Sequence, residues 1–341
     1  MKKNRIDISF SFKNSIVLLF FLGMVSCGTA TDKKKPPIGK ETVPHIVFVT
    51  GDEEYRSEES MPMLARLAKR ELGAKVTICY ALDSLGIIDP NRSDHIAGLE
   101  ALESADLMVL FTRFRSIPKK ERDHIVNYVE SGKPMVGFRT TTHAFFYEND
   151  STQTYWNNEW PAKVFGQQWI THHGHFEDGN APLTKVTKVD STKKHPILRG
   201  FDDFEAYSWL YHVDGGDWKL QGDSSPFLMG RSLRSKHEMD GRLEEFPINN
   251  PVAWTKSYTG SSGKKARVFF TTLGHPFDFK HAIMRKLSLN GIYWALGKED
   301  EIPVTGVNVN LVHRYEPNNS GFGQKFKQNI RPEGINRPFL F

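Results

Sequence analysis

Three runs of the sequence are continuously apolar, and stretches with helical periodicity follow the first two. The runs IVFVT, LMVLF and PMVGF begin at residues 46, 107 and 134. A strand that is apolar on both sides is buried on both faces, which is typical of a parallel sheet covered by helices. The chain therefore predicts an α/β fold, a doubly wound and mostly parallel sheet flanked by helices.

The rest of the chain continues this alternation up to about residue 300. We expect one helix that begins near Pro62 and two further helices over residues 118–131 and 279–296. Strands are expected over residues 45–50, 75–80, 106–112, 134–139, 184–189, 251–258 and 266–272. We therefore expect one α/β domain over residues 45–300, followed by an extended C-terminal arm over residues 301–341.

The N-terminal residues have the pattern of an export signal. Four basic residues precede an apolar run over residues 16–25, and Cys27 follows it at the position where a bacterial lipoprotein is cut and acylated. The run is shorter than the roughly 20 residues of a membrane span. We expect residues 1–26 to be a lipoprotein signal peptide and residues 27–44 a lipid-anchored linker, with an ordinary cleaved signal as the alternative. The mature protein is then exported and anchored to a membrane, in the periplasm or cell envelope.

Charge and cysteine content narrow the possible partners. The formal net charge of +5 falls to +2 without residues 1–26, which carry four basic residues and one acidic residue. The mature chain has no basic patch interleaved with aromatic residues, so nucleic acid is not expected as a partner. Cys79 is the only other cysteine, and a disulfide framework within the mature chain is therefore excluded.

Polar stretches follow four of the predicted strands. They read GDEEYRSEES, TRFRS, RTTTHAFFY and TTLGHPFDF, and begin at residues 51, 112, 139 and 271. In an open parallel sheet, ligands bind outside the carboxyl ends of the strands. Any one of these side chains is equally well explained as a helix cap or a surface charge, but their convergence favours a site. We expect acid/base chemistry from His143 and His275. The substrate-binding candidates on these stretches are Asp52, Glu53, Tyr55, Arg115, Arg139, Thr141 and Tyr147.

A histidine cluster, WITHHGHF, occupies residues 169–176. If this segment is extended, His173 and His175 point to one side and His172 to the other. We expect His173 to face the site and either His172 or His175 to be structural. Gly174 fits a close approach at a binding site and equally a plain strand irregularity.

Longer stretches between residues 45 and 297 resemble the ThuA-like (trehalose utilisation) family. They are EYRSEESMPMLARLAKR, DLMVLFTRFRSIP, SGKPMVGFRTTTHAF, FGQQWITHHGH, HPILRGF, PVAWTKSY and RVFFTTLGH. The resemblance implies a flavodoxin-like fold of the class I glutamine amidotransferase type, and a link to sugar catabolism beside oxidoreductases that make 3-keto sugars. The amidotransferases carry a cysteine nucleophile at the turn where this chain has GFRTT, residues 137–141. No cysteine stands there, so glutaminase chemistry is excluded.

Aromatic residues are concentrated between the turn and the histidine cluster. Residues 145–176 hold nine of them in 32 positions, against 12% in the whole chain. Aromatic rings offer flat faces suited to sugar rings, although most of these nine are expected to be packing residues. We add Trp156 to the substrate-binding candidates.

Two functional classes remain open. In the first, the protein is an enzyme acting on a sugar or an oxidised (3-keto) glycoside, of hydrolase, lyase or isomerase type, with His143 as general acid/base. The sequence requires no cofactor. A divalent metal such as zinc would need His143, His173 and His275 to converge, without a local motif such as H-E-x-x-H. In the second class, the protein is a non-catalytic glycan-binding lipoprotein. Both classes have a small carbohydrate as partner.

Overall fold

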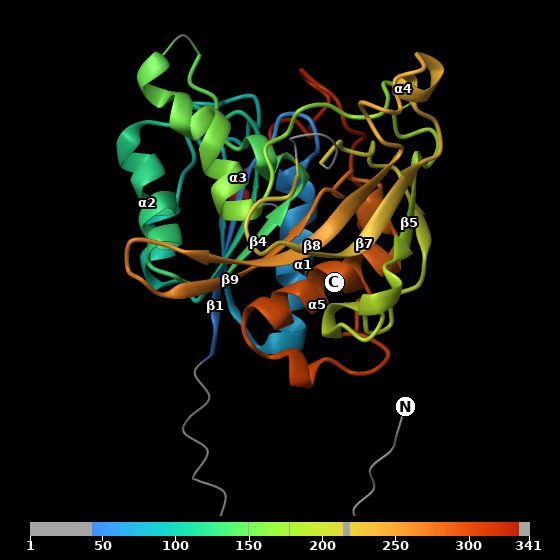
Figure 1. Cartoon of the computed structure of the whole chain (residues 1–341). Helices are drawn as coiled ribbons and strands as arrows, with labels where there is room; N and C mark the ends of the chain where they lie inside the picture. The colour runs from blue at the N-terminus through green and yellow to red at the C-terminus, as the bar shows by residue number, and fades with distance from the viewer. Residues whose placement is uncertain (1–42, 149, 177, 214–218, 334–341) are drawn as a thin grey trace, which may run out of the picture. The chain divides into compact units, whose positions relative to one another are not determined.

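The computed structural model describes residues 43–148, 150–176, 178–213 and 219–333 (Figure 1). Within them, nine strands form one sheet in the order β2-β1-β3-β4-β9-β8-β7-β5-β6. The strands are β1 (His45–Gly51), β2 (Lys75–Cys79), β3 (Leu107–Thr112), β4 (Met135–Phe138), β5 (Thr184–Lys188), β6 (Phe204–Ala206), β7 (Ser225–Ser232), β8 (Asn249–Thr259) and β9 (Lys265–Thr271). The α-helices are α1 (Ser57–Leu72), α2 (Lys119–Glu130), α3 (Trp160–Phe165), α4 (Lys236–Met239) and α5 (Ala282–Ala295).

Most strands of the sheet run in one direction. Strands β2, β1, β3, β4 and β9 pair in parallel. The four remaining strands pair antiparallel, so β7 and β6 return to the direction of the first five while β8 and β5 oppose it. The predicted fold class, a mostly parallel sheet flanked by helices, is confirmed.

Helices cover both faces of the parallel half of the sheet (Figure 1). On one face, Ile46 and Phe48 of β1 belong to a core that includes residues of α1 and α5. On the other face, Val47 and Val49 belong to a second core, which includes residues of α2 and α3. Successive side chains of a strand point to opposite faces, so a strand between two cores is apolar at every position. This explains the continuous apolar runs of the sequence.

Helix α1 begins earlier than predicted. We expected a start near Pro62, but the helix opens at Ser57, and its polar first turn is buried. The reason is a tertiary contact: the carboxylate of Glu59 accepts from Asn318 N at 3.3 Å and lies 2.6 Å from Lys327 Nζ. Apolar periodicity does not detect a helix turn that is buried against polar groups. Strands β6 and β7 and helices α3 and α4 were also not predicted.

The C-terminal arm (residues 301–341, described to residue 333) returns across α1 to the carboxyl ends of the strands. Val307, Val309 and Tyr315 enter the core shared with α1 and α5. Further along, Gly321 N donates to Glu54 O at 2.8 Å. The arm therefore reaches the loop that follows β1.

Two expectations from the sequence concern membranes. Cys27 and the whole predicted signal segment lie outside the described residues. Among the residues that the structure describes, no helix combines the length and the apolar character needed to cross a bilayer.

Candidate functional site

A cavity of about 240 Å³ lies at the carboxyl ends of the parallel strands. It is lined by Glu54, Tyr55, Arg113, His143, Trp169, His172, His175, Trp209, Tyr211 and Phe322. The first four of these residues follow β1, β3 and β4, and the others come from segments outside the parallel sheet. This is where an open α/β sheet binds its ligands.

The loops that follow these strands hold unusual backbone conformations. Arg56, Phe114 and Arg139 follow β1, β3 and β4 and have φ values of 54°, 46° and 39°, in the left-handed region. Within the described residues, Asn329 is the only other non-glycine residue with a positive φ. Such strain is tolerated where the surrounding structure fixes it, and it concentrates at functional sites.

Glu54 is the carboxylate of the cavity. Asp52 shapes its loop, because Asp52 Oδ1 accepts from the backbone N–H groups of Glu54 and Tyr55 at 2.8 Å each. Glu54 Oε2 lies 3.0 Å from Arg113 Nε. Burial raises the pKa of Glu54 from 4.5 to about 7, an effect that Arg113 opposes and Asp52 strengthens. Glu54 can therefore both hold and release a proton near neutral pH.

Of the two candidate histidines in the strand-end loops, His143 and His275, only His143 lines the cavity. Its ring is buried, packs 4.8 Å from the Phe114 ring and 5.1 Å from the Trp169 ring, and shares a 3.2 Å hydrogen bond between Nδ1 and Thr142 Oγ1. Burial, followed by the charges of Arg113 and Arg139, lowers the pKa of His143 well below 6.5. His143 is therefore a neutral imidazole at neutral pH.

Arg139 stands behind the cavity and does not line it. Its guanidinium donates to Tyr55 Oη and to Thr272 O at 2.9 Å each, and lies 4.1 Å and 4.5 Å from the ring centroids of Tyr55 and Tyr211. Burial disfavours its charge, but Tyr211 and Tyr55 hold the pKa of Arg139 above its ordinary value. Arg139, which we predicted to bind substrate, thus holds in place two aromatic rings that line the cavity, those of Tyr55 and Tyr211.

Four other predicted substrate-binding residues, of which only Glu53 is partly exposed, support the same loops. Asp52 accepts from Thr140 Oγ1 as well as from its own loop. Glu53 forms ion pairs with Arg113 and Arg115. Thr141 Oγ1 donates to Leu110 O at 2.8 Å. None of the four lines the cavity, whereas Tyr55 does.

Tyr147 and Trp156, two aromatic residues that we predicted to bind substrate, lie away from the cavity. The guanidinium of Arg122 on α2 lies 5.0 Å from the Tyr147 ring and 4.3 Å from the Trp156 ring. Tyr147 Oη donates to Ile117 O at 2.8 Å. Neither ring lines the cavity, because the first part of the aromatic segment packs against α2.

The expected orientation of the histidine cluster is wrong. His172 and His175 line the cavity with ring centroids 4.4 Å apart, whereas His173 is buried away from it. His173 Nδ1 lies 2.8 Å from Ser235 Oγ, and Nε2 lies 3.4 Å from Asn250 Nδ2. The segment is not a strand, and only His172 forms an isolated bridge, to Tyr211. The strict alternation of side chains between two faces, which we expected for an extended segment, therefore does not hold past Gly174.

His275 is buried and does not line the cavity. Its Nε2 lies 3.1 Å from Asp178 Oδ1 and 3.0 Å from Ser320 Oγ of the C-terminal arm. Its ring contacts the Tyr55 ring edge-on at 6.2 Å. His275 thus links the arm to the loop that follows β9.

The three histidines considered as metal ligands have different surroundings. His143 lines the cavity, His173 contacts Ser235, and His275 contacts Asp178. In the part of the chain that the structure describes, no group of three or more His, Cys, Asp or Glu side chains is arranged to hold a metal ion.

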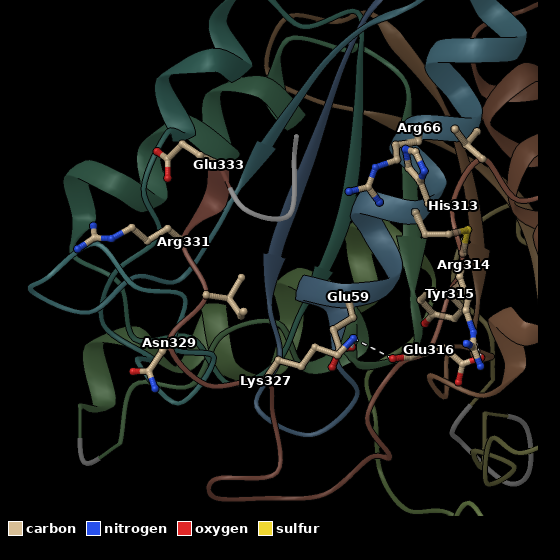
Figure 2. Close-up of a pocket in the computed structure, with 13 residues that line it drawn as sticks. Glu59, Arg66, His313, Arg314, Tyr315, Glu316, Lys327, Asn329, Arg331 and Glu333 are labelled. Atoms are coloured by element: carbon tan, nitrogen blue, oxygen red, sulfur yellow. Dashed lines mark hydrogen bonds and ion pairs between the residues drawn. The ribbon is translucent and has the colours of Figure 1, made fainter. Parts of the chain in front are cut away.

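Larger cavities lie away from the strand ends. The one in Figure 2, of about 670 Å³, lies between α1 and the C-terminal arm. Several of its charged groups pair with one another: Lys327 contacts Glu59 and the carbonyl of Glu316, and Arg314 pairs with Glu316. We favour the smaller cavity as the functional site, because it lies at the carboxyl ends of the parallel strands and is lined by a carboxyl group and an imidazole, those of Glu54 and His143.

Several residues of the cavity were not among the candidates from the sequence. Glu54 and Arg113 stand in the polar stretches and could have been chosen there. His172, His175 and Trp169 belong to the histidine cluster, but their direction depends on tertiary structure. Trp209, Tyr211 and Phe322 lie in segments without any local motif.

The fold and cavity define an α/β protein with a ligand site at the carboxyl ends of its strands. Residues 46–295 match the family described as ThuA, trehalose utilisation, and the chain therefore belongs to this family. Membership supports a function related to carbohydrates in general. No curated protein matches the chain.

Two solved structures show similarity at low sequence identity. A ThuA-like protein from Bacteroides uniformis ATCC 8492 has 16% identity and a TM-score of 0.47, over 80% of this chain and 99% of that one. A ThuA-like protein from Parabacteroides merdae ATCC 43184 has 15% identity and a TM-score of 0.47, over 84% of this chain and 100% of that one.

Proposed function

We propose that the protein is an enzyme of carbohydrate catabolism that acts on an oxidised (3-keto) glycoside, with His143 as the general base. The observation that carries this proposal is a single cavity lined by Glu54, whose pKa is about 7, and by the neutral imidazole of His143. Two ionisable groups with oppositely shifted pKa values in one cavity are typical of an acid/base pair. The aromatic rings around them suit the faces of a sugar.

The proposed step is an elimination. His143 removes the proton from the carbon beside the keto group, and the electron pair forms a double bond as the bond to the glycosidic oxygen breaks. Protonated Glu54 gives its proton to the departing oxygen, so the products are an unsaturated keto sugar and an alcohol. Arg113, 3.0 Å from Glu54, stabilises the carboxylate that remains.

A substrate screen tests this proposal. Keto-glycosides are incubated with the protein, with and without a chelator, and products are detected by mass spectrometry. We expect turnover that His143→Gln lowers by about 100-fold or more, the range for losing a general base. His124→Gln on α2, outside the cavity, is the matched control and should keep full turnover. A chelator-sensitive reaction would assign a role to a divalent metal.

The competing function is glycan binding without catalysis. It would be favoured if sugars raise the melting temperature of the protein but no keto-glycoside is consumed. In that case His143→Gln should weaken binding without any turnover to lose.

We also propose that the chain is exported and anchored to a membrane through acylated Cys27. The support is the basic and apolar sequence that precedes this cysteine. Cell fractionation tests it: the protein should sediment with membranes, and Cys27→Ser should move it to the soluble fraction. Membrane association that persists in the variant would contradict the anchor.

A further inference from the structure

Two phenylalanine rings are exposed beside the cavity. Phe322 of the C-terminal arm is 56% exposed and Phe146 is 45% exposed. Arg113 and Phe114 lie between them: the Arg113 guanidinium is 5.1 Å from the Phe322 ring and 4.4 Å from the Phe114 ring, and the Phe114 ring is 5.4 Å from the Phe146 ring. These four side chains form a continuous row, which we call the phenylalanine row.

The row continues directly from the cavity. Arg113 and Phe322 belong to both, and the Phe114 ring packs 4.8 Å from the His143 ring. A ligand that fills the cavity and extends out of it past Phe322 or His143 would therefore meet the row.

The backbone at both ends of the row is fixed. Gly321 N donates to Glu54 O at 2.8 Å, and Arg56 Nη2 donates to Gly321 O at 2.7 Å. Phe146 N donates to Arg115 O at 3.0 Å. An exposed aromatic ring on an anchored backbone is already ordered before a ligand arrives, which lowers the entropic cost of binding.

The size of the cavity decides which ligand fits this arrangement. About 240 Å³ is below the roughly 300–1,000 Å³ of sites that enclose drug-sized ligands. It suits one sugar ring, whereas a disaccharide has two. We propose that the phenylalanine row is a second subsite, which binds the second ring of a disaccharide whose first ring occupies the cavity. This inference rests on the proposed carbohydrate function.

The chemistry of the row fits a pyranose ring. The C–H faces of such a ring are apolar and pack on aromatic faces, while its hydroxyl groups remain at the rim in water. The Arg113 guanidinium, between two of the rings, gives the row a hydrogen-bond donor. A row of this kind binds a ring without enclosing it.

Calorimetric titration with glucose and with trehalose tests the second subsite. Phe146→Ala is the principal variant, because Phe146 does not line the cavity. We expect it to weaken trehalose binding by about 5- to 10-fold, the value of one lost stacking face, and to change glucose binding by less than about twofold. Phe322→Ala should weaken trehalose binding more than glucose binding. Val304→Ala, an 86% exposed position on the C-terminal arm, is the control and should change neither.

The outcomes separate the two proposals. If the wild-type protein binds neither sugar, the subsite is overturned, whereas the carbohydrate function stands or falls separately on the turnover of keto-glycosides. If it binds glucose, and Phe146→Ala leaves trehalose binding unchanged or weakens both sugars equally, the subsite alone is overturned. A change in self-association of Phe146→Ala without an effect on trehalose would instead identify the row as a contact between protein chains.

Discussion

The parallel half of the sheet and the irregular segments around it make different contributions to the cavity. The loops after β1, β3 and β4 provide its charged and ionisable strand-end groups Glu54, Arg113 and His143. The segments 166–176 and 207–213 and the C-terminal arm provide most of its rings, among them Trp169, Trp209 and Phe322. The regular scaffold thus holds the groups that can move protons, and the irregular chain shapes the space around them.

Arg139 joins the two contributions, and its removal should have the largest effect. In Arg139→Met, Tyr55 Oη, Thr272 O and Trp209 O lose their donor. We expect the free energy of unfolding to fall by about 3–5 kcal/mol in urea denaturation. Arg231→Met, at an exposed position of β7, is the control and should change it by less than about 0.5 kcal/mol. Similar small losses in both variants would mean that the two contributions are not coupled through Arg139.

Glu54 should make stability depend on pH. The folded state holds this proton up to a pKa of about 7, whereas the unfolded state releases it near 4.5. Between these values the folded state binds more protons, so wild-type stability falls as the pH rises. Glu54→Gln should remove the part of this slope that Glu54 contributes, so that the variant becomes about 3 kcal/mol more stable relative to the wild type between pH 4.5 and 7.5. Burial also raises the pKa of Glu58, to about 8, and its part of the slope should remain in both proteins. Urea denaturation of the wild type and the variant at pH 4.5 and at pH 7.5 measures this difference in stability.

The control for Glu54 is Glu205→Gln, at an exposed position of β6. The free energy of unfolding of this variant should depend on pH as that of the wild type does. If Glu54→Gln keeps the wild-type slope as well, the buried carboxyl of the cavity does not titrate as described.

The aromatic rings that line the cavity should control its affinity for sugars, independently of the ionisable groups. Trp209 lines the cavity and packs 4.8 Å from the His172 ring, whereas Trp156 packs on Arg122. On the basis of the proposed function, we expect Trp209→Ala to weaken glucose binding by about 10-fold and Trp156→Ala to leave it unchanged. Calorimetric titration distinguishes them, and the reverse ranking would move the sugar site to the α2 side.

The smallest effect is expected at His173, which the sequence suggested as a catalytic residue. Its ring contacts Ser235 and Asn250, so His173→Gln should lower the free energy of unfolding by about 1 kcal/mol. Turnover per folded molecule should stay within about twofold of the wild type. Ser235→Ala removes the same hydrogen bond and also the cap of α4, in which Ser235 Oγ accepts from Glu238 N at 3.2 Å, so it should cost more. A loss of turnover comparable to that of His143→Gln would restore His173 as a catalytic residue.

Part of the site could be predicted from the sequence because it depends on local order. The polar stretches are adjacent in sequence to the apolar runs, so local sequence was enough to select Tyr55 and His143, which line the cavity. Asp52, Arg115 and Thr141 occur in the same stretches but point into the protein. Local sequence does not distinguish a polar side chain that meets a ligand from one that holds a loop, because both are polar and both follow a strand.

The sequence by itself determined the α/β class, the edge of the sheet at which polar groups line a cavity, and the absence of a cysteine nucleophile at the turn after β4. These properties follow from hydrophobic periodicity and from residue identity at one position. Only the tertiary structure decided which histidines face the cavity, and that Trp209, Tyr211 and Phe322 close it. Phe322 lies 268 positions from Glu54 along the chain, and they meet because the arm packs across α1. Contacts of that separation depend on how the whole chain buries its apolar surface, which no local pattern records.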